Sequence, residues 1–124
     1  MKKYEAMVLS CMDPRFQSKV YKYLKSEKLT GKYSSFTIAG AAIGVTHKRF
    51  KKWHSTFWDN LGVSIKLHKI TKLIVINHKD CGAAKITFKG RNFNSKIENR
   101  IHQKSFSDIK KNLKKKFPDL KLKF

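Results

Sequence analysis

The sequence predicts an α/β fold in which helices flank a mostly parallel central β-sheet. Segments with the pattern of strands alternate along the chain with segments that have helical spacing. The clearest strand, Lys72–Asn77 (KLIVIN), is a continuous aliphatic run, which is typical of a parallel strand covered on both faces. The chain has 124 residues, a length that fits a single domain over residues 1–124.

The first strand and helix are predicted close to the N-terminus. Tyr4–Ser10 is a short apolar run and predicts a buried strand. Asp13 suits a helix N-cap and Pro14 suits the first helical position. A helix is therefore expected from there to about Lys28, with Gly31 as its stop.

A second strand and helix follow. Tyr33–Ala39 (YSSFTIA) is rich in residues that favour strands and ends at Gly40. Residues at helical spacing then mark one face of a helix that we expect to end near Gly62: Phe50, Trp53, Phe57 and Leu61.

The chain beyond Cys81 has a weaker pattern. Ala83–Phe88 predicts a short helix, Gly90–Asn94 a turn, and Ile97 with Ile101 a helical piece. Ser105 and Asp108 resemble a capping box before a final helix that carries Ile109, Leu113 and Phe117 and stops at Pro118. Leu120–Phe124 alternates and predicts an edge strand guarded by its lysines.

The composition excludes several classes of protein. Two cysteines are too few for a disulfide-rich secreted scaffold. No apolar run approaches the roughly 20 residues of a membrane span. The apolar stretch near the N-terminus is too short for a signal peptide and contains Glu5. We therefore expect a cytoplasmic protein with reduced thiols.

The charge is strongly positive. Lys and Arg number 29 against eight Asp and Glu, a net charge of +21, which favours contact with nucleic acid or another polyanion. However, 25 of the 29 are Lys, spread over every segment, which is typical of a solvated surface with biased composition. Five lysines cover a broad side of the last predicted helix: Lys110, Lys111, Lys114, Lys115 and Lys116. Both interpretations remain open.

Three candidate metal ligands follow two of the predicted strands. Cys11 comes directly after the first strand, and His78 and Cys81 follow Lys72–Asn77. The carboxyl ends of parallel strands share one edge of a sheet, where ligands bind. Two thiolates and an imidazole suit Zn²⁺ and leave its fourth position for water. The alternative is two buried cysteines and a core histidine.

Asp13 and Arg15 lie two and four residues after Cys11. A carboxylate paired with an arginine stays ionised near neutral pH. Beside a metal-bound water it can accept a hydrogen bond or a proton. The alternative is an N-cap aspartate and a surface arginine.

These segments resemble a known family. Cys11–Arg15 (CMDPR) resembles the C-x-D-x-R motif of β-class carbonic anhydrases, and His78–Gly82 (HKDCG) resembles their H-x-x-C-G motif. Ala39-Gly40 also matches the end of the strand between the motifs. The resemblance covers roughly Tyr4–Ala84.

The resemblance implies a β-carbonic-anhydrase-like fold with zinc on Cys11, His78 and Cys81. Asp13, oriented by Arg15, is expected either to hold the zinc-bound hydroxide or to ligate zinc itself. The implied reaction is the reversible hydration of CO₂ to bicarbonate. Backbone N–H groups near Gly40 or Gly82 are expected to bind the developing carboxylate. The family also implies a homodimer or higher homo-oligomer.

The sequence departs from the family in two places. The family usually has R-N-A-G-N where this chain has Thr37–Ala41 (TIAGA), and this chain is short. CS₂ or COS therefore remain alternative substrates. A non-enzymatic member whose basic surface binds a polyanion is the alternative function. His47 is a candidate proton shuttle, and Asp80 is expected to cap the chain locally or orient a ligand.

Overall fold

The computed structural model describes residues 3–124 and contains a four-stranded sheet. The strands are β1 (Ala6–Cys11), β2 (Tyr33–Ile38), β3 (Lys72–Ile76) and β4 (Lys121–Lys123). Their order is β2-β1-β3-β4, and every neighbouring pair is parallel. The predicted α/β fold with a parallel sheet is thus confirmed, and β4 is the edge strand that its alternation predicted.

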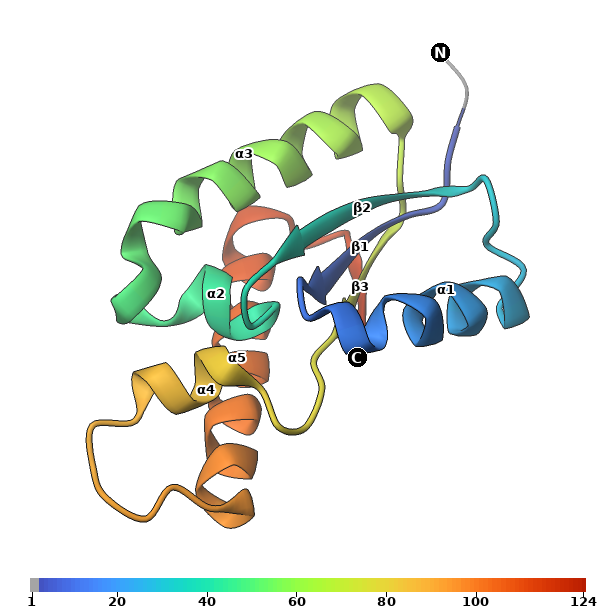
Figure 1. Ribbon diagram of the computed structural model, residues 1–124. Coiled ribbons are helices and arrows are strands. Elements are labelled where there is room, and N and C mark those ends of the chain that lie inside the picture. The colour runs from blue at the N-terminus through green and yellow to red at the C-terminus, as the bar shows by residue number, and fades with distance from the viewer. Residues whose placement is uncertain (1–2) are drawn as a thin grey trace.

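Helices cover both faces of this sheet (Figure 1). Helix α1 (Gln17–Ser26) packs on one face, where a small core forms from Ala6, Val8, Leu24, Leu29 and Ile74. The opposite face carries the larger core, to which β1 and β3 contribute their alternate residues and α2 (Ala42–Thr46), α3 (Lys51–His68) and α5 (Ser95–Lys116) contribute apolar faces. Its fully buried members include Leu9, Phe57, Leu61, Leu73 and Ile109. Burial of each such side chain stabilises the fold by roughly 1.5–3 kcal/mol.

The turn after β1 begins as the sequence predicts. Asp13 caps the short 3₁₀ helix η1 (Pro14–Phe16), and its Oδ1 accepts the Arg15 backbone N–H at 3.0 Å. Pro14 occupies the first helical position. Helix α1 ends at Ser26, two residues before the expected Lys28, because Lys28 adopts a left-handed backbone with φ of 61°.

Helix α3 differs from its prediction at the C-terminal end. We expected it to end near Gly62, but it continues to His68 and is followed by Lys69 in the left-handed conformation. A Cβ at Gly62 would lie 3.5 Å from the ring of Phe117, which is an ordinary contact distance. Gly62 therefore neither ends the helix nor is required there by close packing. A 3₁₀ turn, η2 (Lys48–Phe50), precedes α3.

Helix α5 also differs from its prediction. We expected a helical piece around Ile97 and a new helix capped by Ser105, but Ser95–Lys116 is one helix. Asn94 caps it, since its Oδ1 accepts the Ile97 N–H at 2.9 Å. Ser105 lies in the helix interior and donates its hydroxyl to the His102 carbonyl at 2.7 Å. The capping-box interpretation of Ser105 and Asp108 is therefore wrong.

Two further helices lie near the carboxyl edge of the sheet. Helix α4 (Gly82–Thr87) confirms the short helix expected at Ala83–Phe88, whereas α2 was not predicted. Gly44 in α2 passes so close to the chain that a Cβ would lie 2.2 Å from the Ala39 carbonyl oxygen.

Within residues 3–124, the helices lack the combination of length and apolar character that a membrane span needs.

Candidate metal centre

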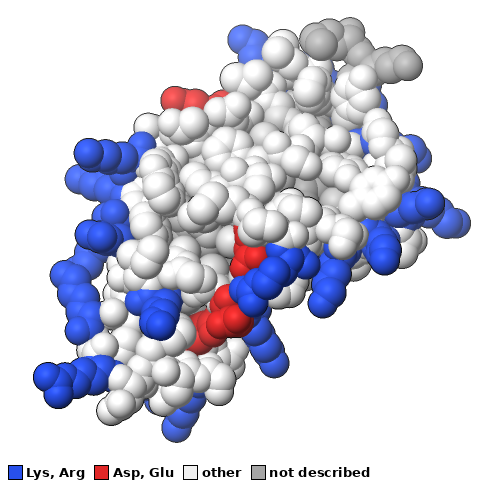
Figure 2. Space-filling view, viewed as in Figure 1, with Lys and Arg blue, Asp and Glu red and all other residues white. Residues whose placement is uncertain are grey.

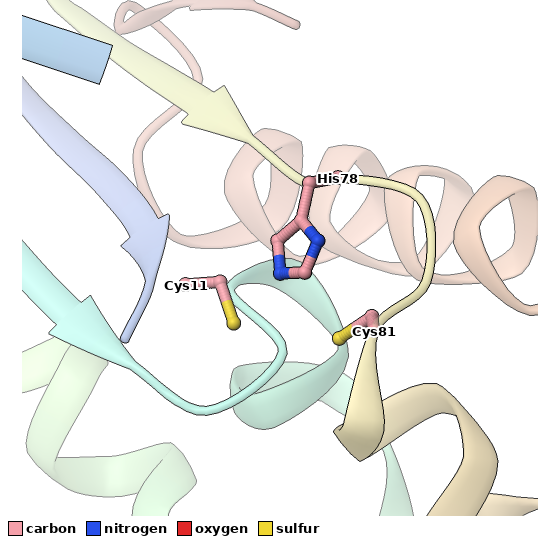
Figure 3. Close-up of side chains that lie close together, drawn as sticks. All are labelled: Cys11, His78 and Cys81. Carbon is pink, nitrogen blue, oxygen red and sulfur yellow. The ribbon is translucent and has the colours of Figure 1, made fainter. Parts of the chain in front are cut away.

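The three predicted metal ligands converge at the carboxyl edge of the sheet (Figure 3). Cys11 is the last residue of β1, His78 follows β3, and Cys81 is the N-cap residue of α4. Their donor atoms all lie within 4.8 Å of one another. Both cysteines are free and buried. Cys11, His78 and Cys81 can therefore hold a metal ion.

The imidazole of His78 is oriented for ligation through Nε2. Its Nδ1 lies 2.7 Å from the Lys79 carbonyl oxygen. A carbonyl only accepts, so Nδ1 carries the proton and Nε2 has the free lone pair. Nε2 is buried and has no hydrogen-bond partner among the described residues. Buried polar atoms are normally satisfied, so this orphaned nitrogen fits a metal ligand.

The thiols of Cys11 and Cys81 are hydrogen-bonded to each other. The hydrogen bond from the Cys81 thiol, together with backbone N–H groups that include Gly40 at 3.3 Å from Sγ, lowers the pKa of Cys11 to about 4 against the opposing effect of burial. The same contact and burial raise the pKa of Cys81. Both thiols must be deprotonated to ligate a metal, so metal binding by the pair would release a proton. Two sulfur donors and one nitrogen donor match the chemistry of zinc.

Arg15 holds Asp13 beside this cluster. Its Nε and Nη2 donate to the Asp13 carboxylate, the shortest bond being 2.7 Å from Nη2 to Oδ2. These bonds lower the pKa of Asp13 to about 2. Oδ2 of Asp13 lies 3.8 Å from His78 Nε2. The predicted ion pair is thus present, with a permanently ionised carboxylate next to the candidate ligands.

Arg15 also reaches the loop between β3 and α4. Nη1 donates to Oδ2 of Asp80 at 2.8 Å, and Nη2 donates to the Asp80 backbone oxygen at 2.9 Å. Asp80 therefore orients Arg15 rather than a ligand. Gln17 secures the other side of the turn, where its Nε2 donates to the carbonyls of Cys11 and Asp13 at 2.9 and 2.8 Å.

Gly40 closes the wall of the site opposite α4. Its backbone is left-handed with φ of 78°, and an added Cβ would lie 2.8 Å from the Cβ of Ala83. Any side chain at this position would push α4, which carries Gly82, away from the sheet. Gly82 is exposed at the first position of α4. The predicted contact of Gly40 or Gly82 with substrate remains a prediction.

A cleft of about 670 Å³ opens onto the cluster and is lined mainly by apolar groups. Cys11 and Asp13 contribute to its lining, and the other lining residues are Met12, Pro14, Ala39, Gly40, Phe50, Trp53, Gly82, Ala83 and Ile86. A second cavity of about 400 Å³ lies next to Cys11 and His78, between α1 and the C-terminal end of the chain. The Phe16 ring stacks on His78 there, with centroids 4.2 Å apart.

His47, the candidate proton shuttle, lies outside the ligand cluster. Nδ1 of His47 accepts the Arg49 N–H at 3.0 Å and caps η2. His47 lines a separate cleft with Arg100 and Lys104. A ring nitrogen of His54 lies 2.9 Å from the His47 carbonyl oxygen, so His54 contacts the turn before α3.

Sequence reasoning missed a buried polar group in α5 that contacts the loop between β3 and α4 (residues 77–81), which we call the ligand loop. Glu98 and His102 of α5 are buried, and the Glu98 carboxylate accepts the N–H groups of Asp80 and Cys81. Burial opposes ionisation of Glu98, but these bonds and the bond from His102 keep its pKa below the usual value. A signal was present, because the two residues continue the buried face of Ile109 and Leu113 at helical spacing.

Comparison with known proteins agrees with this geometry. A family model described as "Putative carbonic anhydrase" matches residues 1–120. The chain belongs to this family. Two uncharacterized proteins, from Rickettsia bellii and Rickettsia conorii, are each 26% identical to this family member over 117 residues, or 94% of its length. The match covers 71% and 63% of those two chains, which are longer. No solved structure matches significantly.

Proposed function

We propose that the protein catalyses the zinc-dependent, reversible hydration of CO₂ to bicarbonate. The observation that carries the proposal is the convergence of Cys11, His78 and Cys81 beside an ionised Asp13, in a chain that belongs to a carbonic-anhydrase-like family. Zn²⁺ held there would supply the Lewis acidity that lets water ionise near neutral pH.

Asp13 orients the attacking water in this proposal. A carboxyl with a pKa of about 2 is too weak a base to keep a proton at neutral pH. Oδ2 therefore acts as a hydrogen-bond acceptor, and Arg15 fixes its direction. The same arrangement would suit ligation of the metal by Asp13 in a resting form.

The apolar cleft provides the substrate site. CO₂ is small and apolar, and the cleft offers it an apolar lining that includes Ala39, Trp53 and Ala83. The N–H of Gly40 already donates to Cys11 Sγ. We therefore assign the contact with the developing carboxylate to Gly82, at the start of α4. CS₂ and COS have the same linear shape and are the competing substrates.

A second copy of the chain is proposed to cover the mouth of this cleft. Met12 and Ile86 are 63% and 57% exposed there, and Trp53 is 37% exposed. Exposed apolar side chains grouped around a site are typical of an interaction surface. Light scattering coupled to size exclusion measures the expected homodimer directly.

Metal content and activity test the proposed function together. We expect about one zinc per chain in untagged protein and CO₂ hydration that a chelator abolishes and zinc restores. His78→Ala and Cys81→Ser should lose both zinc and hydration, while His68→Ala, at the far end of α3, is the matched control that keeps both. Hydration that persists in folded Cys81→Ser would contradict the proposal. Parallel assays with CS₂ and COS identify the preferred substrate.

Polyanion binding is the alternative, supported by the charge of +21 and by the exposed lysines of α5. The Lys and Arg side chains in Figure 2 are spread around the outline of the face shown. A genuine polyanion contact would give an affinity for RNA or DNA that falls steeply with salt. That affinity would survive Cys81→Ser.

A further inference from the structure

A continuous chain of hydrogen bonds connects α2 to α5 and returns to the ligand loop. The Ala42 N–H donates to Oδ1 of Asn77 at 3.1 Å, and Nδ2 of Asn77 lies 2.8 Å from Nδ1 of His102. Nε2 of His102 lies 3.0 Å from Oε2 of Glu98, which accepts the Cys81 N–H at 2.9 Å. The network thus contacts the loop before His78, through Asn77, and again at Cys81.

The Ala42 N–H determines which atom donates and which accepts in each of the hydrogen bonds that link Asn77, His102 and Glu98. The Ala42 N–H fixes Oδ1 of Asn77 as an acceptor, so Nδ2 is a donor and Nδ1 of His102 must accept. The proton of the neutral imidazole is then on Nε2 and is donated to Glu98. Ser105 receives a second bond from Asn77 Nδ2 at 3.3 Å.

Glu98 is the point where the network meets the ligand loop. Oε1 accepts the Asp80 N–H at 3.1 Å and Oε2 accepts the Cys81 N–H at 2.9 Å. Asp80 has a left-handed backbone with φ of 57°, a conformation that is uncommon outside glycine but more frequent for aspartate than for most residues. The same Asp80 presents its carbonyl and its carboxylate to Arg15.

We propose that Glu98 is a positioning residue that holds the turn at Asp80 and Cys81 and, through Asp80 and Arg15, sets the direction of Asp13. The influence of Glu98 on metal binding rests on the proposed function, but its hold on the turn does not. His102 and Asn77 keep the carboxylate in place from behind. Helix α5, which carries none of the predicted ligands, thereby controls the geometry of the site.

The Glu98 carboxylate cannot be replaced by an amide. It accepts three hydrogen bonds on two oxygens, whereas glutamine offers one acceptor oxygen and directs its NH₂ group at the N–H of Asp80 or at the pair formed by Cys81 and His102. The matched control is Asp108→Asn. It removes a carboxylate from the same helix, where Asp108 is paired with Lys104 away from the site.

Amide hydrogen exchange on the metal-free protein tests the hold on the turn. In Glu98→Gln we expect the amide hydrogens of Asp80 and Cys81 to exchange about tenfold faster or more. One amide would lose its acceptor, and the other would keep only a neutral oxygen in place of a charged one. The Nε–H signal of Arg15 should shift or broaden in the same variant, and Asp108→Asn should change none of these signals. A purely structural role in α5 would not move the Arg15 signal.

Metal binding gives the second readout. We expect Glu98→Gln to bind Zn²⁺ about 10–100-fold more weakly in competition with a chromophoric chelator, and the visible spectrum of the Co²⁺ form to change. Folded Glu98→Gln with unchanged exchange at Asp80 and Cys81 and an unchanged Arg15 signal would overturn the proposal. Should that variant not fold, Glu98→Asp keeps the charge but is one methylene too short to reach both amides, and the same criteria apply. Wild-type protein that binds no zinc would refute the proposed function, while the exchange data would still decide the role of Glu98.

Discussion

Arg15 and Asp80 lie 65 positions apart in the sequence and are joined by two hydrogen bonds, one from Nη1 to the carboxylate at 2.8 Å and one from Nη2 to the backbone oxygen at 2.9 Å. Nε and Nη2 of the same guanidinium group also donate to the Asp13 carboxylate. The turn after β1 and the loop after β3 are thus fastened to each other by one side chain. The same contact therefore helps to keep the candidate ligands Cys11, His78 and Cys81 together.

Removal of this guanidinium should change the titration of Asp13. Arg15→Ala is expected to raise the pKa of Asp13 from about 2 toward its ordinary value of 3.8. The side-chain hydrogen bonds from Arg15 are the main reason why the pKa of Asp13 is low in the wild type. In the wild type, ionised Asp13 stabilises the fold above about pH 3.8, and this contribution is lost as the pH falls toward 2. NMR titration of the carboxyl carbon measures the shift. Arg49→Ala is the control, and equal midpoints in the two variants would contradict the prediction.

A side chain at Gly40 should destabilise the fold more than one at Gly31. Both glycines have a positive φ, but a Cβ at Gly40 would meet Ala83 at 2.8 Å, whereas a Cβ at Gly31 meets nothing within 4 Å. We expect Gly31→Ala to lower the free energy of unfolding by about 1 kcal/mol through backbone strain alone. Gly40→Ala should cost about 2–4 kcal/mol, because overpacking adds to that strain. Urea denaturation measures the two values, and similar losses would refute the packing argument.

The aromatic stack on His78 should contribute to metal affinity. Phe16 lies parallel to the imidazole, with an interplanar angle of 25°, and restrains the ring while Nδ1 is bonded to Lys79. We expect Phe16→Leu to weaken Zn²⁺ binding about two- to tenfold. Phe106→Leu removes a ring that packs on Phe124 instead and should leave the affinity unchanged. Isothermal titration of the metal-free variants measures the effect. Equal affinities for the two variants would mean that the stack does not orient the ligand.

Zinc bound by the two thiols should stabilise the folded state of the protein. Bound metal is expected to raise the melting temperature of the wild type, by an amount that grows with free zinc, because a ligand of the native state stabilises it by mass action. A concentration of 100 times the Kd corresponds to about 2.7 kcal/mol. Cys11→Ser should remove this dependence, and His54→Ala, outside the cluster, should retain it. Calorimetry at several zinc concentrations makes the comparison, and a zinc-dependent melting temperature in Cys11→Ser would exclude Cys11 as a ligand.

The sequence alone predicted the parallel sheet, which the structure confirms, and the three candidate metal ligands that the structure brings together. The aliphatic run before His78 and the apolar run before Cys11 carry a strong local signal, because a buried parallel strand needs such residues on both faces. The carboxyl ends of such strands meet at one edge, which is why the sequence predicts that Cys11, His78 and Cys81 lie together. The capping geometry of Asp13 and Pro14 is equally local.

The tertiary structure decided everything that depends on contacts between distant segments. Gly62 has the local pattern of a helix end, but α3 continues through it to His68. Ser105 has the local pattern of a helix start, but it lies inside α5, where its hydroxyl accepts from Asn77 of the neighbouring loop and donates to the His102 carbonyl. The sequence places Glu98 and His102 on the same helix face as Ile109 and Leu113, but it does not indicate which groups they contact. They become part of the site only because α5 packs behind the loop after β3, where the backbone N–H groups of Asp80 and Cys81 need an acceptor.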